Sequence, residues 1–194
     1  MNIGIYIYES AEVLDFSGPF EVFATASRIC GEGAALKVFL VGETSGMVQA
    51  RGGYRVGPCF GFHNHPEIDV LIVPGGIHTG EMMKPQVLDW IARTAKQAKL
   101  VASVCTGVFL LAKAEVITTE TVTTHWEDIA DLRAEFPDLT VDEEKRWVDQ
   151  GAVVTSAGIS AGIDMSLHLV ERLFGQAAAR KTARQMEYNW AAHR

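Results

Sequence analysis

Five short runs of consecutive apolar residues, rich in Val, Ile and Leu, recur along the chain. Runs of this length without polar alternation are typical of strands that are buried on both faces of a parallel sheet. They predict strands at Asn2–Tyr8, Leu36–Val41, Ile68–Val73, Leu100–Val104 and Val153–Ser156.

The segments between these runs place apolar residues at helical spacing. Pro19, which follows Gly18, and Pro85 are each expected to open a helix, because proline is well tolerated in a first helical turn. Gly175 is typical of a residue that ends one. The predicted helices cover residues 18–29, 85–97, 108–114, 126–135, 160–174 and 176 to about 188.

Strands that alternate with helices predict an α/β fold, a three-layer α/β/α sandwich around a mainly parallel sheet. Two stretches, residues 48–56 and 147–154, instead resemble hairpins that turn at Gly52-Gly53 and at Gln150-Gly151. The sequence contains no internal repeat or low-complexity tract. The whole chain, residues 1–194, is therefore expected to form a single domain.

Composition narrows the class of function. Of 194 residues, 48% are hydrophobic and 21% are charged, and the formal net charge is -7. A negative protein is a poor partner for nucleic acid, no apolar run is long enough to span a bilayer, and the N-terminus lacks the features of a signal peptide. We expect a cytoplasmic enzyme that acts on a small molecule, with no nucleic-acid or membrane partner.

Cys105 directly follows the predicted strand Leu100–Val104 and precedes a predicted helix. Ligands of open α/β sheets bind at the carboxyl ends of the strands. Ser103 and Gly107 flank the cysteine at the two positions that are small in a nucleophile elbow. The amino end of the following helix is expected to favour the thiolate. The pattern thus favours a nucleophile over a buried structural cysteine.

The remaining cysteines and most histidines have simpler expected roles. Three cysteines without C-x-x-C spacing argue against a disulfide framework or a zinc site, so Cys30 and Cys59 are expected to be buried and structural. His63 and His65 have the spacing of metal ligands but lack partner ligands, so no metal is expected. His168 lies on an apolar helix and is expected in the core or at an interface.

A Pro-Gly-Gly segment ends the predicted strand Ile68–Val73 at the same edge of the sheet. Glycine allows a close approach of ligand to backbone, so the amides of Gly76 and Thr106 are candidates to hold charge that develops on a substrate. Gly75 and Ile77 complete this candidate binding loop. An ordinary turn at a strand end is an equally good interpretation.

Two acidic residues follow the first strand. Asp15 is expected in a loop, where Ser17 caps the next helix and leaves the carboxyl free. A carboxyl beside a thiolate is pushed toward protonation and can exchange protons with the sulfur or a substrate. Glu21 has either a helix-dipole role or a supporting role behind the reacting groups.

His125, in the segment T-T-H-W, is the remaining candidate. A Cys–His hydrolase needs an imidazole within reach of the sulfur, and Thr106 stands directly after Cys105 instead. A structural or supporting role is therefore the preferred interpretation of His125. The sequence leaves open whether its ring lies near the sulfur.

The segments D-F-S-G-P-F-E-V-F, V-P-G-G, S-V-C-T-G, T-T-H-W and S-A-G-I-S-A-G-I-D together resemble the ThiJ/PfpI family of the class I glutamine amidotransferase-like superfamily. The resemblance covers essentially the whole chain. Within the family, Asp15 in the first segment and Thr106 after the cysteine are similar to the isonitrile hydratase branch, which includes the amino-terminal domains of AraC-type regulators. It implies a flavodoxin-like fold, often dimeric. It also implies that Cys105, Asp15 and Thr106 convert an isonitrile and water to an N-substituted formamide without a metal or organic cofactor.

Departures from related branches limit the alternatives. Ser103 and the lack of a late H-x-E segment disfavour ammonia release from glutamine, and Thr106 disfavours peptidase activity. Two other hypotheses stay open. One is a ligand or redox sensor, for which the end of the chain at Arg194 leaves no room for a DNA-reading domain. The other is a glyoxalase or deglycase that uses Glu21. A homodimer is expected, with the helices that begin at Trp126 and Ser160 as candidate interfaces.

Overall fold

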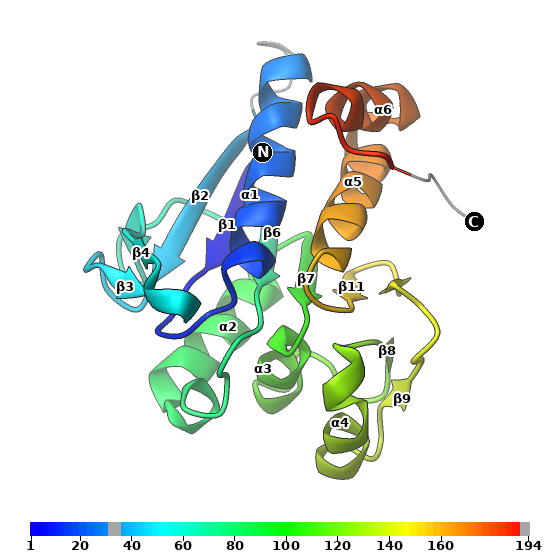
Figure 1. Cartoon of the computed structure of the whole chain (residues 1–194). Helices are drawn as coiled ribbons and strands as arrows, with labels where there is room; N and C mark the ends of the chain where they lie inside the picture. Colours follow the sequence, from blue (N-terminus) through cyan, green and yellow to red (C-terminus); the bar gives the residue numbers. More distant parts are fainter. Residues whose placement is uncertain (31–35, 191–194) are drawn as a thin grey trace.

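A seven-stranded sheet organises the computed structural model, which describes residues 1–30 and 36–190 (Figure 1). The strand order is β10-β11-β7-β6-β1-β2-β5. The strands are β1 (Asn2–Tyr6), β2 (Lys37–Gly42), β5 (Phe60–Gly61), β6 (Val70–Val73), β7 (Leu100–Val104), β10 (Trp147–Asp149) and β11 (Val153–Ser156). Only β10 and β11 pair antiparallel within this sheet, which confirms the predicted mainly parallel sheet.

Helices cover both faces of the sheet, as the predicted three-layer sandwich requires (Figure 1). α1, α5 and α6 pack against one another on one face, and α2 and α3 contact each other on the opposite face. The helices are α1 (Val13–Cys30), α2 (Pro85–Gln97), α3 (Gly107–Lys113), α4 (Ile129–Glu135), α5 (Ala161–Phe174) and α6 (Gln176–Gln185).

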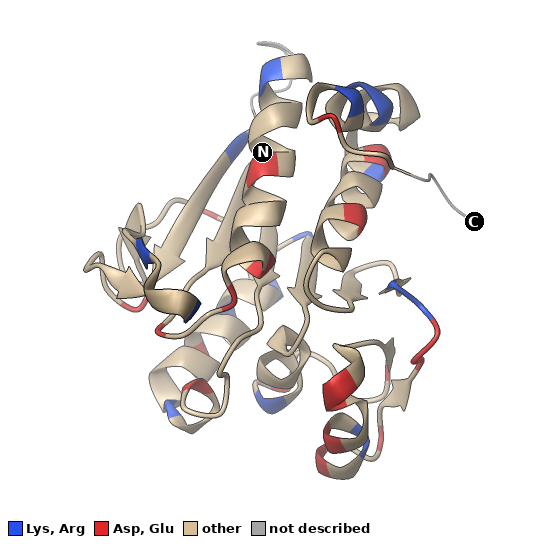
Figure 2. Ribbon diagram, viewed as in Figure 1, with Lys and Arg blue, Asp and Glu red and all other residues tan. Residues whose placement is uncertain are grey.

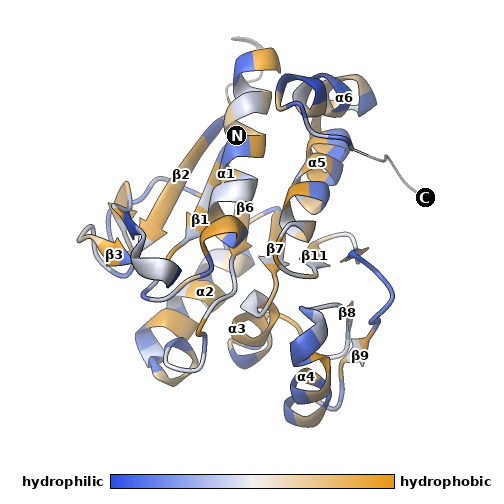
Figure 3. Cartoon of the chain, viewed as in Figure 1, coloured by the Kyte–Doolittle hydropathy of each residue, from blue (hydrophilic) through white to orange (hydrophobic). Residues whose placement is uncertain are grey.

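The core lies where the sheet meets the helices, and Figure 3 shows hydrophobic residues concentrated on the central strands. Every residue of β6 and β7 is buried, which explains why their sequences lack polar alternation. The largest fully buried side chains include Tyr6, Phe23, Trp90 and Phe109. Each such side chain contributes about 1.5–3 kcal/mol by leaving water, so the core fixes the strand ends that carry the site.

The first helix begins earlier than the sequence indicates. α1 starts at Val13, so Asp15 lies in its first turn and not in a loop. Ser17 is not the cap, because its hydroxyl donates to the carbonyl of Val13 at 2.7 Å. Pro19 lies inside the helix. An interior proline lacks an amide donor and crowds the carbonyl four residues earlier, yet α1 continues through Pro19 to Cys30.

Both predicted hairpins are confirmed. β3 (Val48–Gln49) pairs antiparallel with β4 (Arg55–Val56), and β10 pairs with β11 in the same way. Gly52, Gly53 and Gly151 have φ of 67°, 78° and 83° in the connecting turns. These left-handed conformations suit glycine.

The structure adds details that the pattern did not predict. β8 (Thr121–Val122) and β9 (Thr140–Val141) form a small parallel sheet of their own. Strands of two residues are too short to show an apolar period. The helix expected from residue 126 begins with a 3-10 turn, Trp126–Asp128, before α4, and α6 ends at Gln185 rather than near residue 188.

Charge is distributed unevenly over the fold. Figure 2 shows acidic residues on α4 and the turn before it, whereas basic residues gather on α6 at the other end of the molecule. Within residues 1–30 and 36–190, no helix has both the length and the apolar character needed to cross a membrane.

Candidate active site

Cys105 lies in a sharp turn between the end of β7 and the start of α3. Its φ is 56°, in the left-handed region. A residue other than glycine adopts this conformation at a cost of about 1–3 kcal/mol. The Cys105 amide donates to the Ser156 carbonyl at 3.0 Å, and the Thr124 hydroxyl donates to the Cys105 carbonyl at 2.9 Å. The backbone of the predicted nucleophile elbow is therefore present.

Gly107 allows this turn to pack on the neighbouring strand. A Cβ atom at this position would lie 2.1 Å from the carbonyl oxygen of Val73, at the end of β6. Only glycine avoids that overlap. The turn places Cys105 at the carboxyl edge of the sheet with 7% of its surface exposed.

Asp15 reaches the sulfur from the first turn of α1 and is fully buried. Its Oδ2 accepts a hydrogen bond from the Gly75 amide at 3.1 Å. Burial raises the pKa of Asp15 to about 7, although the bonds from the Gly75 amide and the Cys105 thiol partly oppose this rise. Asp15 is thus an acid that titrates near neutral pH beside the cysteine.

The sequence led us to expect that the start of α3 lowers the pKa of Cys105 and favours the thiolate. The structure contradicts this expectation. Burial raises the pKa of the thiol well above its ordinary value, and the charge of Asp15 raises it further. The Thr106 amide, which donates to the sulfur, opposes this only partly. α3 has only seven residues, and its dipole does not outweigh a buried acid next to the sulfur. Near neutral pH the proton resides on the sulfur.

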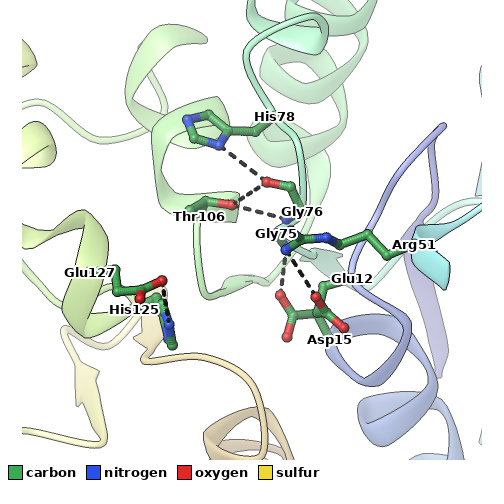
Figure 4. Close-up of polar contacts among 9 residues, drawn as sticks. All are labelled: Glu12, Asp15, Arg51, Gly75, Gly76, His78, Thr106, His125 and Glu127. Atoms are coloured by element: carbon green, nitrogen blue, oxygen red, sulfur yellow. Dashed lines mark hydrogen bonds and ion pairs between the residues drawn. The ribbon is translucent and has the colours of Figure 1, made fainter.

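Thr106 links the elbow to the Pro-Gly-Gly loop (Figure 4). Its hydroxyl accepts from the Gly76 amide at 3.0 Å and donates to the Gly76 carbonyl at 3.1 Å. A Cβ atom on Gly75 would lie 2.6 Å from the Thr106 nitrogen and 2.8 Å from Asp15 Oδ2. The two glycines therefore bring Asp15 and Thr106 together beside Cys105.

The amides of this loop are already engaged. Gly75 donates to Asp15 and Gly76 donates to Thr106, so both amides position side chains of the site. Their binding of developing charge stays a prediction. Ile77, the next residue, is 56% exposed, and its amide donates to the Ser10 carbonyl at 3.1 Å.

His125 lies beside the sulfur, which answers the question that the sequence left open. A Cβ atom on Gly158 would lie 2.6 Å from Cys105 Sγ and 2.9 Å from His125 Nδ1. The other ring nitrogen, Nε2, lies 3.7 Å from a carboxylate oxygen of Glu127 (Figure 4). The site therefore has an imidazole as well as a carboxyl next to the cysteine.

Glu21 does not take part in the site. Its carboxylate is half exposed, accepts from the Thr25 hydroxyl at 2.9 Å and pairs with Arg28 at 3.4 Å, further along α1 than Asp15. The predicted supporting role for Glu21 is therefore wrong. The glyoxalase or deglycase hypothesis, which relied on this residue, loses its support.

The other cysteines are less buried than expected. All three cysteines are free thiols, but Cys59 is exposed and Cys30, at the end of α1, is only partly buried. Both lie in surface segments, where a small thiol has little core to enter.

Two other histidines, His65 and His168, have structural contacts. His65 Nε2 accepts from the Trp90 indole at 2.9 Å. His168 is buried against Asp149 at 2.6 Å and stacks on Trp147 with ring centroids 4.0 Å apart, which confirms a place in the core. Across residues 1–30 and 36–190, no group of three potential ligands could hold a metal ion.

Three residues near the site were missed by the sequence reasoning. Arg51, on the β3–β4 hairpin, pairs with Glu12 at 3.2 Å, and its charge lowers the pKa of Asp15 slightly (Figure 4). Asp128 adds to the rise in the pKa of Cys105. Gly158 separates the sulfur from His125. Arg51 and Asp128 do not follow a predicted strand of the main sheet. Gly158 comes two residues after the strand Val153–Ser156, in the segment S-A-G-I-S-A-G, but nothing in the sequence indicated that it would lie beside the sulfur.

Comparison with known proteins gives a consistent result. The model of the DJ-1/PfpI family matches residues 1–172. The chain is 34% identical over 189 residues to the isonitrile hydratase of Pseudomonas putida, which covers 97% of this chain and 78% of that protein. It is 25% identical to the HTH-type transcriptional regulator GbdR of Pseudomonas aeruginosa, covering 90% of this chain but only 47% of the regulator. The chain thus spans about half the length of that regulator.

The fold comparison agrees. A crystal structure of a ThiJ/PfpI family protein from Pseudomonas syringae superposes with a TM-score of 0.87 at 26% identity, covering 98% of this chain and 76% of that one. The chain belongs to the DJ-1/PfpI family.

Proposed function

We propose that this protein is a cysteine-dependent hydratase that converts an isonitrile to an N-substituted formamide. The observation that carries the proposal is the contact between the buried Asp15 carboxyl, whose pKa is raised to about 7, and the Cys105 thiol. The similarity to isonitrile hydratase over most of the chain supports the choice of substrate.

The first step joins the sulfur to the isonitrile carbon. Ionised Asp15 accepts the thiol proton as sulfur attacks the terminal carbon, and it then delivers that proton to the same carbon. The product is a thioimidate, R–N=CH–S, bonded to Cys105. A protonated resting thiol suits this sequence, because the proton that the carbon needs is already present at the site.

The second step returns the cysteine. Water adds to the thioimidate carbon while nitrogen gains a proton, and the tetrahedral adduct then releases the N-substituted formamide and the thiol. The reaction consumes one isonitrile and one water and needs no metal or organic cofactor. Thr106 is a positioning residue in this scheme, because it holds the Gly76 loop through both of its hydroxyl contacts.

Formamide production from cyclohexyl isocyanide tests the proposal. We expect turnover by the wild-type protein and a loss of at least about 1,000-fold in Cys105→Ala, because the covalent route is removed. Cys59→Ala is the matched control, since this thiol is exposed and lies outside the site. Equal inactivity of wild type and Cys105→Ala across isonitriles of several sizes would contradict the proposal.

A sensor is the second candidate, and the similarity to GbdR favours it. A redox sensor needs a thiolate that peroxide can oxidise. Because burial and Asp15 keep the Cys105 proton in place, we expect slow oxidation at pH 7 by mass spectrometry. Rapid formation of a stable sulfinic acid at Cys105, with no turnover of any isonitrile, would favour the sensor over the hydratase.

A further inference from the structure

We propose that His125 is the second acid–base group of the site and that it activates the water in the second step. The inference rests on the proposed hydratase function. Addition of water to the thioimidate requires a base for the water proton and an acid for the nitrogen. One imidazole beside the sulfur performs both tasks in succession.

The position of His125 supports this role. Its Nδ1 and the Cys105 sulfur lie 2.9 Å and 2.6 Å from one point, the place of a Cβ atom at Gly158. Because residue 158 is glycine, its own side chain does not occupy that point. A carbon attached to the sulfur is therefore within reach of Nδ1, either directly or through one water molecule.

The bonding state of the ring also supports it. His125 Nδ1 is buried and forms no hydrogen bond with any residue in 1–30 or 36–190. A buried polar atom without a partner is uncommon and requires an explanation. The remaining ring surface is mostly enclosed, with 19% of the side chain exposed. The unpaired nitrogen thus faces the reacting atoms and not solvent.

Glu127 favours the tautomer that a base requires. Its carboxylate lies 3.7 Å from Nε2 (Figure 4). A carboxylate on one side of a neutral imidazole favours the proton on the facing nitrogen. Nδ1 then keeps its lone pair and is free to accept a proton from water.

Asp15 and His125 then divide the reaction. They come from α1 and from the segment after β8, and Figure 4 shows them on separate sides of the site. Asp15 moves the thiol proton to the isonitrile carbon. His125 takes one proton from the attacking water, the hydroxyl bonds to the carbon, and the imidazolium gives its proton to the nitrogen. The hydroxyl proton returns to sulfur as the C–S bond breaks, so all atoms balance.

Intact-protein mass spectrometry during turnover tests the division. In His125→Ala we expect the thioimidate on Cys105 to accumulate, since its formation needs only Asp15, while formamide release falls by about 100-fold. Added imidazole is expected to restore release, and His125→Gln, which keeps the volume of the ring, is expected to behave like the alanine variant without imidazole. His63→Gln is the matched control on an exposed histidine.

The outcomes separate this inference from the proposed function. No turnover by the wild-type protein contradicts the hydratase itself. Wild-type turnover with an unaffected His125→Gln variant contradicts the role of His125. A variant that is slow in both steps, without an accumulated adduct or imidazole rescue, shows a structural role and also overturns the inference.

Discussion

At the scale of single residues, the site depends on two buried groups that share one proton. Burial raises the pKa of both Asp15 and Cys105, and each group affects the other. Because the thiol has the higher pKa, the carboxyl loses its proton first as the pH rises. The reactive resting state is an ionised Asp15 beside a protonated Cys105.

This order predicts the pH dependence of activity. Asp15 accepts the thiol proton only when ionised, and its pKa is raised to about 7. We therefore expect kcat/KM to rise through about pH 7 and to be lower by about 100-fold at pH 5, since each pH unit below a pKa reduces the ionised fraction tenfold. The pH profile of formamide production measures this.

Two carboxamide variants complete that experiment. Asp15→Asn is expected to lose most activity, and its remaining kcat/KM is expected not to rise through pH 7. Glu12→Gln is expected to keep the rise of kcat/KM with pH but to move its midpoint to a slightly lower pH, because the charge of Glu12 raises the pKa of Asp15. If kcat/KM of Asp15→Asn still rose through pH 7 as in wild type, another group would be responsible for the pH dependence.

The sequence predicted the residues of the site better than their ionisation. The place of Cys105 after a buried strand followed directly from the apolar pattern. The small residues on either side of it, Ser103 and Gly107, indicated the nucleophile elbow. The raised thiol pKa depends on how many atoms surround the sulfur and on the approach of Asp15 from another element. Those quantities arise only when distant segments pack together.

At the scale of elements, the elbow depends on a close approach of α3 to β6. The backbone of Gly107 touches the end of that strand so closely that a methyl group there would overlap the Val73 carbonyl at 2.1 Å. A backbone atom cannot move aside as a flexible side chain can. The glycine is therefore needed for folding of the turn as well as for its reactivity.

Gly107→Ala is accordingly expected to be strongly destabilising, by about 3 kcal/mol or more, as is typical of overpacking against backbone. Thermal unfolding followed by circular dichroism measures the change. Gly80→Ala is the matched control, because its backbone is helical and a Cβ atom there meets nothing within 4 Å. A Gly107→Ala variant with the stability of wild type would contradict this account of the turn.

The element predictions differed in quality for a physical reason. Buried strands were found because burial on both faces leaves a continuous apolar run. The start of α1 was misplaced because Pro19 resembles a first-turn residue, and only packing of the preceding turn shows that the helix already began at Val13. That turn carries Asp15, so the error affected the site directly.

At the scale of the whole molecule, an ion-pair network connects the antiparallel strands β10 and β11, at one edge of the sheet, to α5. Asp149 accepts hydrogen bonds from Arg172 at 2.8 and 2.9 Å and contacts His168 at 2.6 Å. Arg172 also donates to the Gly151 carbonyl in the hairpin turn at 2.9 Å. This network joins β10 and β11 to the helix that follows Gly158.

The network predicts a pH-dependent contribution to stability. Burial opposes ionisation of Asp149, but its contacts with His168, the Gly151 amide and Arg172 lower its pKa below the ordinary value. A carboxyl whose pKa is lowered in the folded protein stabilises the fold when the pH lies above its ordinary pKa. This contribution is lost as the pH falls through the lowered pKa of the folded state.

We expect Asp149→Asn to lower Tm by about 2–4 °C at pH 7, the change that about 1 kcal/mol produces in a domain of this size. The difference from wild type is expected to shrink below about pH 4, where the wild-type carboxyl also begins to lose its charge. Asp89→Asn, in an exposed pair with Arg93, is expected to change Tm by less than about 1 °C. An equal effect of both substitutions would contradict the prediction.

The absence of a side chain at Gly158 affects which molecules can approach Cys105. Gly158 carries no side chain, so on its side of the sulfur, between Cys105 and His125, main chain alone borders the space. For the proposed hydratase we therefore expect a rod-shaped reagent with its electrophilic atom at the tip to react faster than a branched carbonyl, whose substituents crowd the sulfur.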